Sequence, residues 1–361
     1  MNKTLNAFAT TWALVGCALL ASGAEPTPPL TWSQLPDIPD KEGFAAPFVG
    51  ASNGALIVAG GANFPNGYPW EGGKKLWYDS VFVLEKPNGK WKTGHRLPRR
   101  LAYGVSINTD KGLLCVGGGD SKKHLTDVFL LEWIDGKIKA TEYPALPRPC
   151  AFASGARVGN IVYLAGGIET PTATQAMNTF WALNLGKVQE GWKELPTWPG
   201  PERMLAVAGS AKRSFFLISG TSLHPDAAGK PERTYLRDGY RYSPKSGWKK
   251  ISDIPAPAIA SPSPAPVVNR SKLLVLCGDD GSKVGFEPLS KHPGFPKRTL
   301  AYDTKMDSWS DAGKLPFSIV TVPVTRWKGH FVIANGEARP GVRSPSVWWA
   351  DPRAKRKKGS K

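Results

Sequence analysis

The sequence predicts an all-β protein built from six repeats of one strand-rich unit. The first repeated mark, here called the glycine mark, is an apolar strand ending in a small residue and glycine: Leu56–Gly61, Leu113–Gly118, Ile161–Gly167, Phe215–Gly220, Leu273–Gly278 and His330–Gly336. The second, the tryptophan mark, ends in Leu-Pro or Ile-Pro: Trp32–Pro36, Trp91–Pro98, Ile138–Pro147, Trp192–Pro196, Trp248–Pro255 and Trp309–Pro316. Both marks recur roughly every 50–60 residues. Alternating strands fill the gaps, and almost no segment has a helical period.

This pattern resembles the kelch β-propeller. In that fold each blade is a sheet of four antiparallel strands, the glycine pair closes the second strand and the Trp lies on the fourth. The stretch Ile138–Pro147 keeps the proline but has no Trp. The count of marks predicts a six-bladed propeller.

The two ends of the propeller predict how its ring closes. The last repeat has a third strand at Ser346–Asp351 but no tryptophan mark after it. The chain before the first glycine mark supplies that missing strand at Thr31–Pro36. We therefore expect the N-terminal strand to complete the last blade, which would remove an exposed sheet edge.

The segments outside residues 25–351 have the composition of targeting and tail sequences. Residues 1–24 read as a signal peptide, with Lys3, an apolar run over Leu5–Ala21 and a small-residue cleavage site. This predicts a periplasmic or secreted protein with no membrane span; a lipobox-like Leu14–Cys17 leaves lipid anchoring through Cys17 as an alternative. Pro352–Lys361 reads as a disordered basic tail.

Charge and cysteine content narrow the function. The formal net charge of +18 would suit an anionic ligand, and export makes nucleic acid an unlikely partner class. Cys115, Cys150 and Cys277 are read as buried free thiols, the first and last inside strands. No residues have metal-ligand spacing, and loop residues His224 and His292 are read as solvated, so neither a metal nor a cofactor is expected.

Three connections after second strands are much longer than the others. They are Gly61–Ser80, Gly220–Gly239 and Gly278–Thr299, and all are rich in aromatic and basic residues. Strand alternation places them on one side of the disc, together with the stretch Asn335–Ser344. Long loops in a compact domain are usually functional, so we expect them to form the walls of a pocket over the central channel.

The stretch Asn335–Ser344 breaks the repeat, because it carries Glu337, Arg339 and Arg343 just after a glycine mark. Two interpretations follow from the residues alone. Glu337 is a loop carboxylate that pairs with an arginine to hold a Pro-Gly turn. Alternatively, Glu337 is a general base beside an anion-binding arginine.

The motif "NGEARPGVR" resembles the signature of bacterial N-acetylneuraminate epimerase (sialic acid mutarotase), a periplasmic kelch propeller. The likeness extends to Leu56–Gly67, Gly89–Ser106 and Leu113–Asp120. It implies an isomerase that interconverts the anomers of a sialic acid without a cofactor, with Glu337 and Arg343 as catalytic residues. It also implies that Arg343, Asn63 and Arg339 bind the sugar.

The chain departs from the family in two respects. In the usual epimerase, the segment that corresponds to residues 335–343 precedes the segment that corresponds to residues 31–118. In this chain the order is reversed, so the chain looks like the cyclically permuted mutarotase branch. The family's arginine before Ala-Tyr-Gly-Val-Ser is Leu101 here, with Arg99 and Arg100 upstream. A carbohydrate-binding propeller without catalysis and a protein-interaction propeller remain open alternatives, and Glu71, Glu232 and Glu287 are the next candidate bases.

Overall fold

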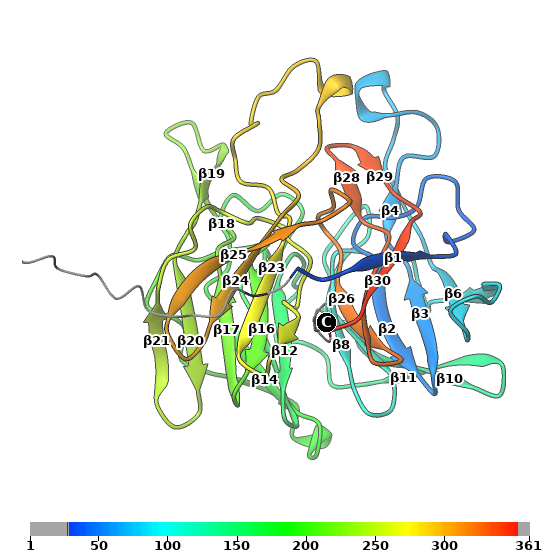
Figure 1. The fold of residues 1–361 in the computed structure, drawn as a ribbon, viewed down its shortest axis with the longest axis horizontal. Coiled ribbons are helices and arrows are strands. Elements are labelled where there is room, and N and C mark those ends of the chain that lie inside the picture. The colour runs from blue at the N-terminus through cyan, green and yellow to red at the C-terminus, as the bar shows by residue number, and fades with distance from the viewer. Residues whose placement is uncertain (1–26, 28, 353–361) are drawn as a thin grey trace, which may run out of the picture.

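The computed structural model describes residue 27 and residues 29–352. It contains six four-stranded antiparallel sheets, which are the six blades of a β-propeller (Figure 1). The predicted fold class is therefore confirmed. The predicted signal peptide, Cys17 and all of the predicted tail except Pro352 lie outside the described residues. Within the described part, no helix is long and apolar enough to cross a membrane.

Each blade runs from an inner strand outward, and the blades are numbered along the chain. Blades 1 to 3 comprise β2 (Phe48–Ser52), β3 (Ala55–Ala59), β6 (Ser80–Leu84), β7 (Lys92–Arg96); β8 (Val105–Asn108), β9 (Leu113–Val116), β10 (Val128–Ile134), β11 (Lys137–Glu142); and β12 (Ser154–Val158), β13 (Ile161–Ala165), β14 (Phe180–Asn184), β15 (Trp192–Glu194). Blades 4 to 6 comprise β16 (Val207–Ala211), β17 (Ser214–Ile218), β20 (Gly239–Ser243), β21 (Gly247–Ile251); β22 (Val267–Val268), β23 (Lys272–Leu276), β24 (Arg298–Asp303), β25 (Ser308–Lys314); and β26 (Val324–Trp327), β27 (His330–Ala334), β30 (Val347–Ala350), β1 (Trp32–Leu35).

Three further two-stranded sheets and three 3-10 helices lie in the connections. The small sheets are β4 (Ala62–Asn63) with β5 (Leu76–Trp77), β18 (Thr221–Pro225) with β19 (Pro231–Tyr235), and β28 (Glu337–Arg339) with β29 (Val342–Arg343). The 3-10 helices are η1 (Pro69–Glu71), η2 (Val188–Glu190) and η3 (Leu289–Lys291). Figure 1 shows the three small sheets on one face of the molecule, at the top of the view. The long connections therefore share a face, as the sequence predicts.

The last blade is closed by the N-terminal strand. β1 pairs antiparallel with β30, from Trp32 opposite Ala350 to Leu35 opposite Val347. The Trp32 ring meets Phe317 edge-on at 5.2 Å. The predicted split blade is confirmed, and its outer strand is held by both hydrogen bonds and packing.

A closed ring of backbone hydrogen bonds surrounds the upper mouth of the channel, on the face of the long connections. One residue from the segment that leads into the inner strand of each blade contributes: Ala46, Tyr103, Phe152, Leu205, Ala260 and Thr321. Each N–H donates to the carbonyl of the preceding blade at 2.6–3.2 Å, and Ala46 donates to Thr321, which joins blade 1 to blade 6. All six have φ between 50° and 65°. This left-handed conformation is uncommon outside glycine, so the ring fixes the geometry of the mouth.

The tryptophan mark is explained by a contact between neighbouring blades. In four blades the indole N–H donates to a backbone carbonyl just after the outer strand of the preceding blade, at 2.8–2.9 Å: Trp91 to Pro36, Trp192 to Pro144, Trp248 to Pro196 and Trp309 to Ser252. In the blade without the Trp, Ile138 packs against the apolar core instead. In these four blades the mark therefore ties the blade to the preceding one.

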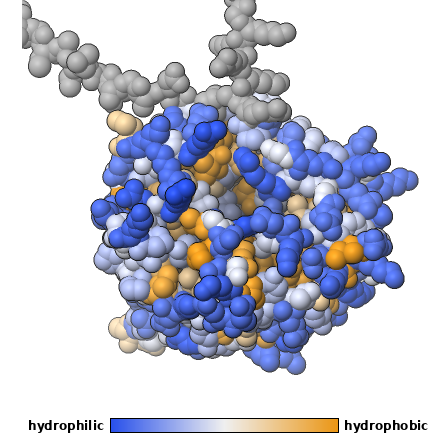
Figure 2. Space-filling view, turned by 90° about the horizontal axis from the view of Figure 1, so that it is seen from below, coloured by the Kyte–Doolittle hydropathy of each residue, from blue (hydrophilic) through white to orange (hydrophobic). Residues whose placement is uncertain are grey.

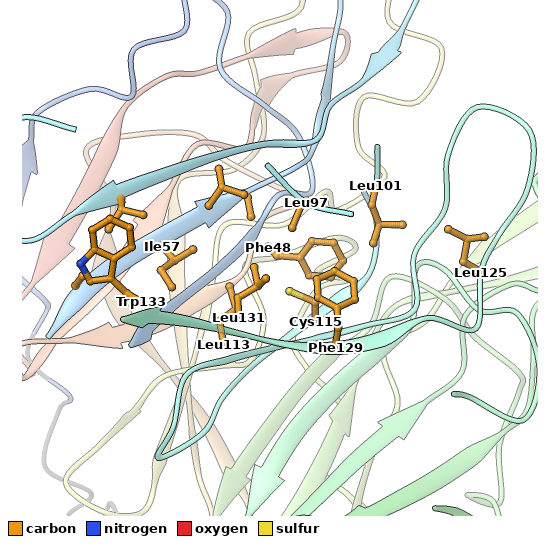
Figure 3. Close-up of a cluster of buried hydrophobic side chains, with 14 residues drawn as sticks. Phe48, Ile57, Leu97, Leu101, Leu113, Cys115, Leu125, Phe129, Leu131 and Trp133 are labelled. Atoms are coloured by element: carbon orange, nitrogen blue, oxygen red, sulfur yellow. The ribbon is translucent and has the colours of Figure 1, made fainter. Parts of the chain in front are cut away.

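The apolar core lies between the blades. Figure 3 shows one such cluster, in which Phe48 and Ile57 of blade 1 meet Phe129 and Leu131 of blade 2. Leu101 points into this cluster and is fully buried. The residue before Ala-Tyr-Gly-Val-Ser, which is an arginine in the family that the sequence resembles, is therefore a core side chain in this protein.

The three cysteines of the described chain are free and buried, as predicted. Burial raises the pKa of the Cys150 and Cys277 thiols to about 12 and raises that of Cys115 as well. The expected location of Cys277 inside a strand is wrong. It follows the end of β23 with φ of 53°, because it is the small residue just before the glycine of its mark, where the chain turns.

The channel is much wider at the face opposite the long connections. Figure 2 shows that face, where hydrophobic residues are visible in a hollow among hydrophilic ones. The cavity there has a volume of about 770 Å³, and three arginines, Arg157, Arg270 and Arg326, are among its lining residues. The cavity inside the upper mouth, at the level of the hydrogen-bond ring, has a volume of only about 80 Å³.

Candidate functional site

The motif at 335–343 forms a hairpin, β28–β29, which extends from blade 6 on the face of the long connections (Figure 1). Asn335 begins the turn with φ of 71°, and its Oδ1 accepts the N–H of Phe44 at 3.0 Å. Gly336 has φ of 115°, and a Cβ there would lie 2.6 Å from Ile319 Cγ1. Glycine is therefore required at position 336 for the chain to turn, and the residues after it are free to carry chemistry.

Glu337 and Arg343 face each other across this hairpin. Arg343 Nη1 donates to Glu337 Oε1 at 2.9 Å, and the Gly341 N–H donates to the same oxygen at 2.8 Å. The Arg343 side chain is 5% exposed and that of Glu337 is 19% exposed. In the described part of the chain, Glu337 Oε2 accepts no hydrogen bond. The carboxylate is thus held through one oxygen while the other is left open.

Arg343 is fixed by two further contacts with blade 1. Its guanidinium carbon lies 4.8 Å from the centre of the Phe64 ring, and its Nε donates to the carbonyl of Ala62 at 3.4 Å. A guanidinium that stacks on an aromatic ring keeps its planar fork in one orientation. The pair therefore sits at the seam between the first and last blades.

The other two predicted binding residues lie nearby without touching Glu337. Asn63 follows Ala62 on β4 and is 1% exposed; its Nδ2 donates to the Gly43 carbonyl at 2.9 Å. Arg339 contacts both flanking connections: its Nη1 donates to the Ser290 carbonyl at 2.7 Å, and its guanidinium carbon lies 5.9 Å from the centre of the Trp70 ring. The structure thus brings Glu337 and Arg343 together, buries Asn63 and directs Arg339 towards the flanking connections.

Two of the long connections clasp the hairpin. On one side η1 of the 61–80 connection leans on it: a Cβ on Gly341 would lie 2.9 Å from Pro69 Cγ. On the other side the 278–299 connection is bonded through Ser318, whose Oγ accepts the Phe295 N–H and donates to the Ala338 carbonyl. The expected loop walls exist on both sides of Glu337.

The residue after the glycine mark occupies an equivalent position in all six blades: Ala62, Gly119, Ile168, Thr221, Asp279 and Glu337. Each pairs with the residue before a member of the hydrogen-bond ring. Asp279, in blade 5, is therefore a second carboxylate at the upper mouth. The sequence interpretation missed it, although an alignment of the six glycine marks would have revealed it.

Asp279 has different partners from Glu337. Its Oδ2 accepts the Tyr235 hydroxyl at 3.1 Å and its Oδ1 accepts the Gly281 N–H at 3.0 Å. Burial, with the Asp279 charge beside it, raises the pKa of Tyr235 to about 12. Tyr235 belongs to the 220–239 connection, so the third long loop contacts the rim through Asp279.

The remaining sequence candidates are placed less favourably. Glu71, Glu232 and Glu287 are exposed. His224 Nδ1 lies 2.7 Å from Glu202 Oε1. The expected solvation of His292 is wrong: it is 5% exposed, because Phe286 and Phe295 pack around it, and burial lowers its pKa. Among the described residues, no group of three or more His, Cys, Asp or Glu side chains is arranged to hold a metal ion.

The wide lower cavity lacks the groups for acid–base chemistry. Its lining contains three arginines but no aspartate or glutamate. Arg157 is already engaged in two hydrogen bonds of 2.9 Å to Asp110. The end of the channel that has carboxylates for acid–base chemistry is therefore the upper mouth.

The fold and the hairpin define a class: a six-bladed kelch-type propeller with a carboxylate–guanidinium pair beside the upper mouth of its channel. Within the chain, residues 23–140 match the family model for N-acetylneuraminate epimerase. The matched segment contains Asn63 but ends well before Glu337 and Arg343.

Curated relatives with the same name match parts of the chain. The N-acetylneuraminate epimerase of Yersinia enterocolitica is 25% identical over 234 residues, which is 58% of this chain and 57% of that protein. The one from Brucella suis is 35% identical over 127 residues, 31% of this chain and 32% of that protein. The chain thus spans about a third to somewhat over half of the length of these relatives.

A solved structure, "Structure of YjhT", aligns with a TM-score of 0.65 over 88% of this chain and 97% of that chain, at 15% sequence identity. This likeness supports the propeller fold. It covers nearly the whole of both chains, in contrast to the partial sequence matches.

Proposed function

We propose that this protein is a sugar mutarotase that interconverts the α and β anomers of N-acetylneuraminate. The observation that carries the proposal is Glu337, a carboxylate held by Arg343 with one oxygen open at the rim of the channel. The match of residues 23–140 to the epimerase family model supports the same substrate class. A cyclic permutation would divide a linear sequence match into pieces, which is consistent with the partial coverage of the curated relatives.

The chemistry needs one acid–base group and no cofactor. Glu337 accepts the proton of the anomeric hydroxyl while the bond between the anomeric carbon and the ring oxygen breaks, and it passes that proton on to the ring oxygen. The product is an open-chain keto acid. Rotation next to the keto carbon presents its other face, and the reverse steps close the ring as the opposite anomer. A positioned acid–base group contributes about 10²–10⁴-fold to such a reaction.

Arg343 has two roles in this proposal. Its charge and its hydrogen bond keep Glu337 oriented. The carboxylate of the sugar also binds the Arg343 guanidinium and competes with Glu337 for it. Substrate binding therefore draws Arg343 away from Glu337 and frees the base to act.

The substrate would lie above the channel, between the clasping loops. The upper cavity of about 80 Å³ is smaller than the several hundred Å³ that a ligand pocket usually provides. The connections 61–80 and 278–299 rise on either side of the hairpin and bound the space above it. Export to the periplasm or beyond the cell, as residues 1–24 suggest, would place the enzyme where free sialic acids arrive.

The test is an NMR time course of the α/β anomer ratio of N-acetylneuraminate after dissolution of one pure anomer. We expect the protein to accelerate the approach to equilibrium in proportion to its concentration. A propeller that only binds carbohydrate or another protein would leave the spontaneous rate unchanged, and that result would overturn the proposal.

A further inference from the structure

Lys75 places a cation at the upper mouth that has no acidic partner among the described residues. Its Nζ lies 5.1 Å from the centre of the Trp77 ring, 5.2 Å from that of Tyr103, and 3.4 Å from the Tyr103 hydroxyl. Tyr103 belongs to blade 2, whereas Lys75 belongs to the long connection of blade 1. The lysine therefore reaches across the seam between two blades.

The rings beneath Lys75 continue as a row along the mouth. Trp77 meets Tyr103 edge-on at 6.4 Å, and Tyr103 lies 4.6 Å from Phe152. Tyr103 and Phe152 both line the upper cavity and both belong to the hydrogen-bond ring. The hydrogen-bond ring holds the backbone of Tyr103 and Phe152 rigidly, so this row of aromatic side chains is a preformed apolar platform.

This arrangement has the chemistry of an anion site with an aromatic floor. An ammonium group is strongly hydrated, and holding it against two rings removes part of that hydration. Two other cations on this face do have partners: Arg343 has Glu337, and Arg339 has the Ser290 carbonyl. An anionic group of a ligand would supply the partner that Lys75 lacks.

Lys75 and Glu337 belong to the same rim. Trp77 pairs with Ala62 in the small sheet β4–β5. The Ala62 carbonyl is the acceptor for Arg343 Nε, and Arg343 holds Glu337. The 61–80 connection, which carries Lys75, is thus bonded directly to Arg343, the residue that positions Glu337.

We propose that Lys75 and the Tyr103 hydroxyl bind the carboxylate of an anionic sugar, while an apolar face of the sugar packs on Tyr103 and Phe152. This rests on the proposed mutarotase function and extends it by assigning a second cation to carboxylate recognition. Lys75 then acts with Arg343 as a two-cation clamp that restricts the site to acidic sugars. The flexible stem of lysine allows the ammonium to follow the carboxylate as the sugar ring opens.

The experiment is a calorimetric titration of the full chain with N-acetylneuraminate and with its neutral methyl ester. We expect Lys75→Met to raise the Kd for the acid about tenfold or more, the usual size of a hydrogen bond to a charged group, and to leave the Kd for the ester within about twofold. Lys74→Met, at the exposed neighbouring lysine, should match the wild type. Lys75→Arg should retain most of the affinity for the acid.

An unchanged Kd for the acid in Lys75→Met, or an equal loss for acid and ester, would overturn the assignment. Absence of acid binding by the wild type would overturn it too. The anomer-exchange assay judges the enzyme separately. A wild type that binds the acid through Lys75 yet never accelerates exchange would refute the mutarotase proposal and leave the anion site standing.

Discussion

Glu337 and Asp279 occupy equivalent positions in neighbouring blades, yet only Glu337 is bonded by a guanidinium. Each follows the glycine that ends a second strand, and each pairs with the residue before a member of the hydrogen-bond ring, Val320 and Ile259 respectively. Arg343 holds Glu337 at 2.9 Å, whereas Asp279 is bonded by the Tyr235 hydroxyl and the Gly281 N–H. The propeller thus supplies its own matched control for the role of a rim carboxylate.

Glu337→Gln should abolish most catalysis while the sugar still binds. The amide keeps the size and much of the hydrogen bonding but cannot accept the anomeric proton, so the catalysed exchange rate should fall by about 10²–10⁴-fold. NMR exchange and calorimetric binding measure the two effects separately. Asp279→Asn, the control at the equivalent position, should retain activity.

Full activity in Glu337→Gln would show that another residue is the base. Asp279 would then be tested first, because it is a carboxylate on the same rim. Glu71, Glu232 and Glu287 would follow as the exposed acids of the long connections.

Arg343→Lys should weaken binding and turnover together. Lysine keeps the charge but loses the fork that contacts both Glu337 and Ala62, as well as the stacking on Phe64. We expect KM to rise and kcat to fall, each by about tenfold, as measured by the initial rate of anomer exchange over a range of sugar concentrations. A change in KM alone would mean that Arg343 binds the substrate without positioning the base.

Leu35→Ala should destabilise the whole propeller. Leu35 is 6% exposed and lies in the core cluster shared by blades 1 and 6. Loss of its side chain should cost about 2–5 kcal/mol in unfolding free energy. The adjacent exposed Gln34→Ala should change it by less than about 0.5 kcal/mol. Deletion of residues 25–36 should promote aggregation, since it exposes β30, and normal urea unfolding of that deletion would contradict the closure.

The protein should lose stability as the pH falls below about 6.5. Burial lowers the pKa of His124 and of His292 from the ordinary value of 6.5 for histidine. The unfolded chain therefore binds protons at a higher pH than the folded one, so the stability present above pH 6.5 is lost on acidification through the folded pKa values. Urea unfolding between pH 7.5 and 5.5 should show this slope, and His124→Gln should reduce it. An unchanged slope in that variant would show that other groups control the acid response.

The repeat marks predicted the architecture because each encodes a contact of fixed geometry. A Cβ on Gly336 would collide with Ile319, and the Trp91 indole reaches the carbonyl of Pro36 in the adjacent blade. Such requirements leave a residue signature at the same place in every blade. The missing tryptophan mark of the last blade likewise predicted the pairing of β1 with β30.

The features that escaped prediction depend on contacts between loops that have no repeat. His292 is buried by aromatic residues of its own connection, Phe286 and Phe295, which no periodic pattern reveals. Lys75 acquires its significance only because Tyr103 of the next blade lies beneath it. Glu337 and Arg343 were identified by resemblance, and the spacing alone left their pairing undecided.

The closure between β1 and β30 also sets the order in which the chain can assemble. Blades 1 to 5 each draw their strands from one continuous stretch and can form as that stretch is synthesised. Blade 6, and with it the hydrogen bond from Ala46 to Thr321, must wait until nearly the last described residues are available. Until then β1 remains an unpaired strand at the start of the chain, exposed to wrong partners. Completion of the ring is therefore a late step in biogenesis, and the rim that carries Glu337 is finished only when it occurs.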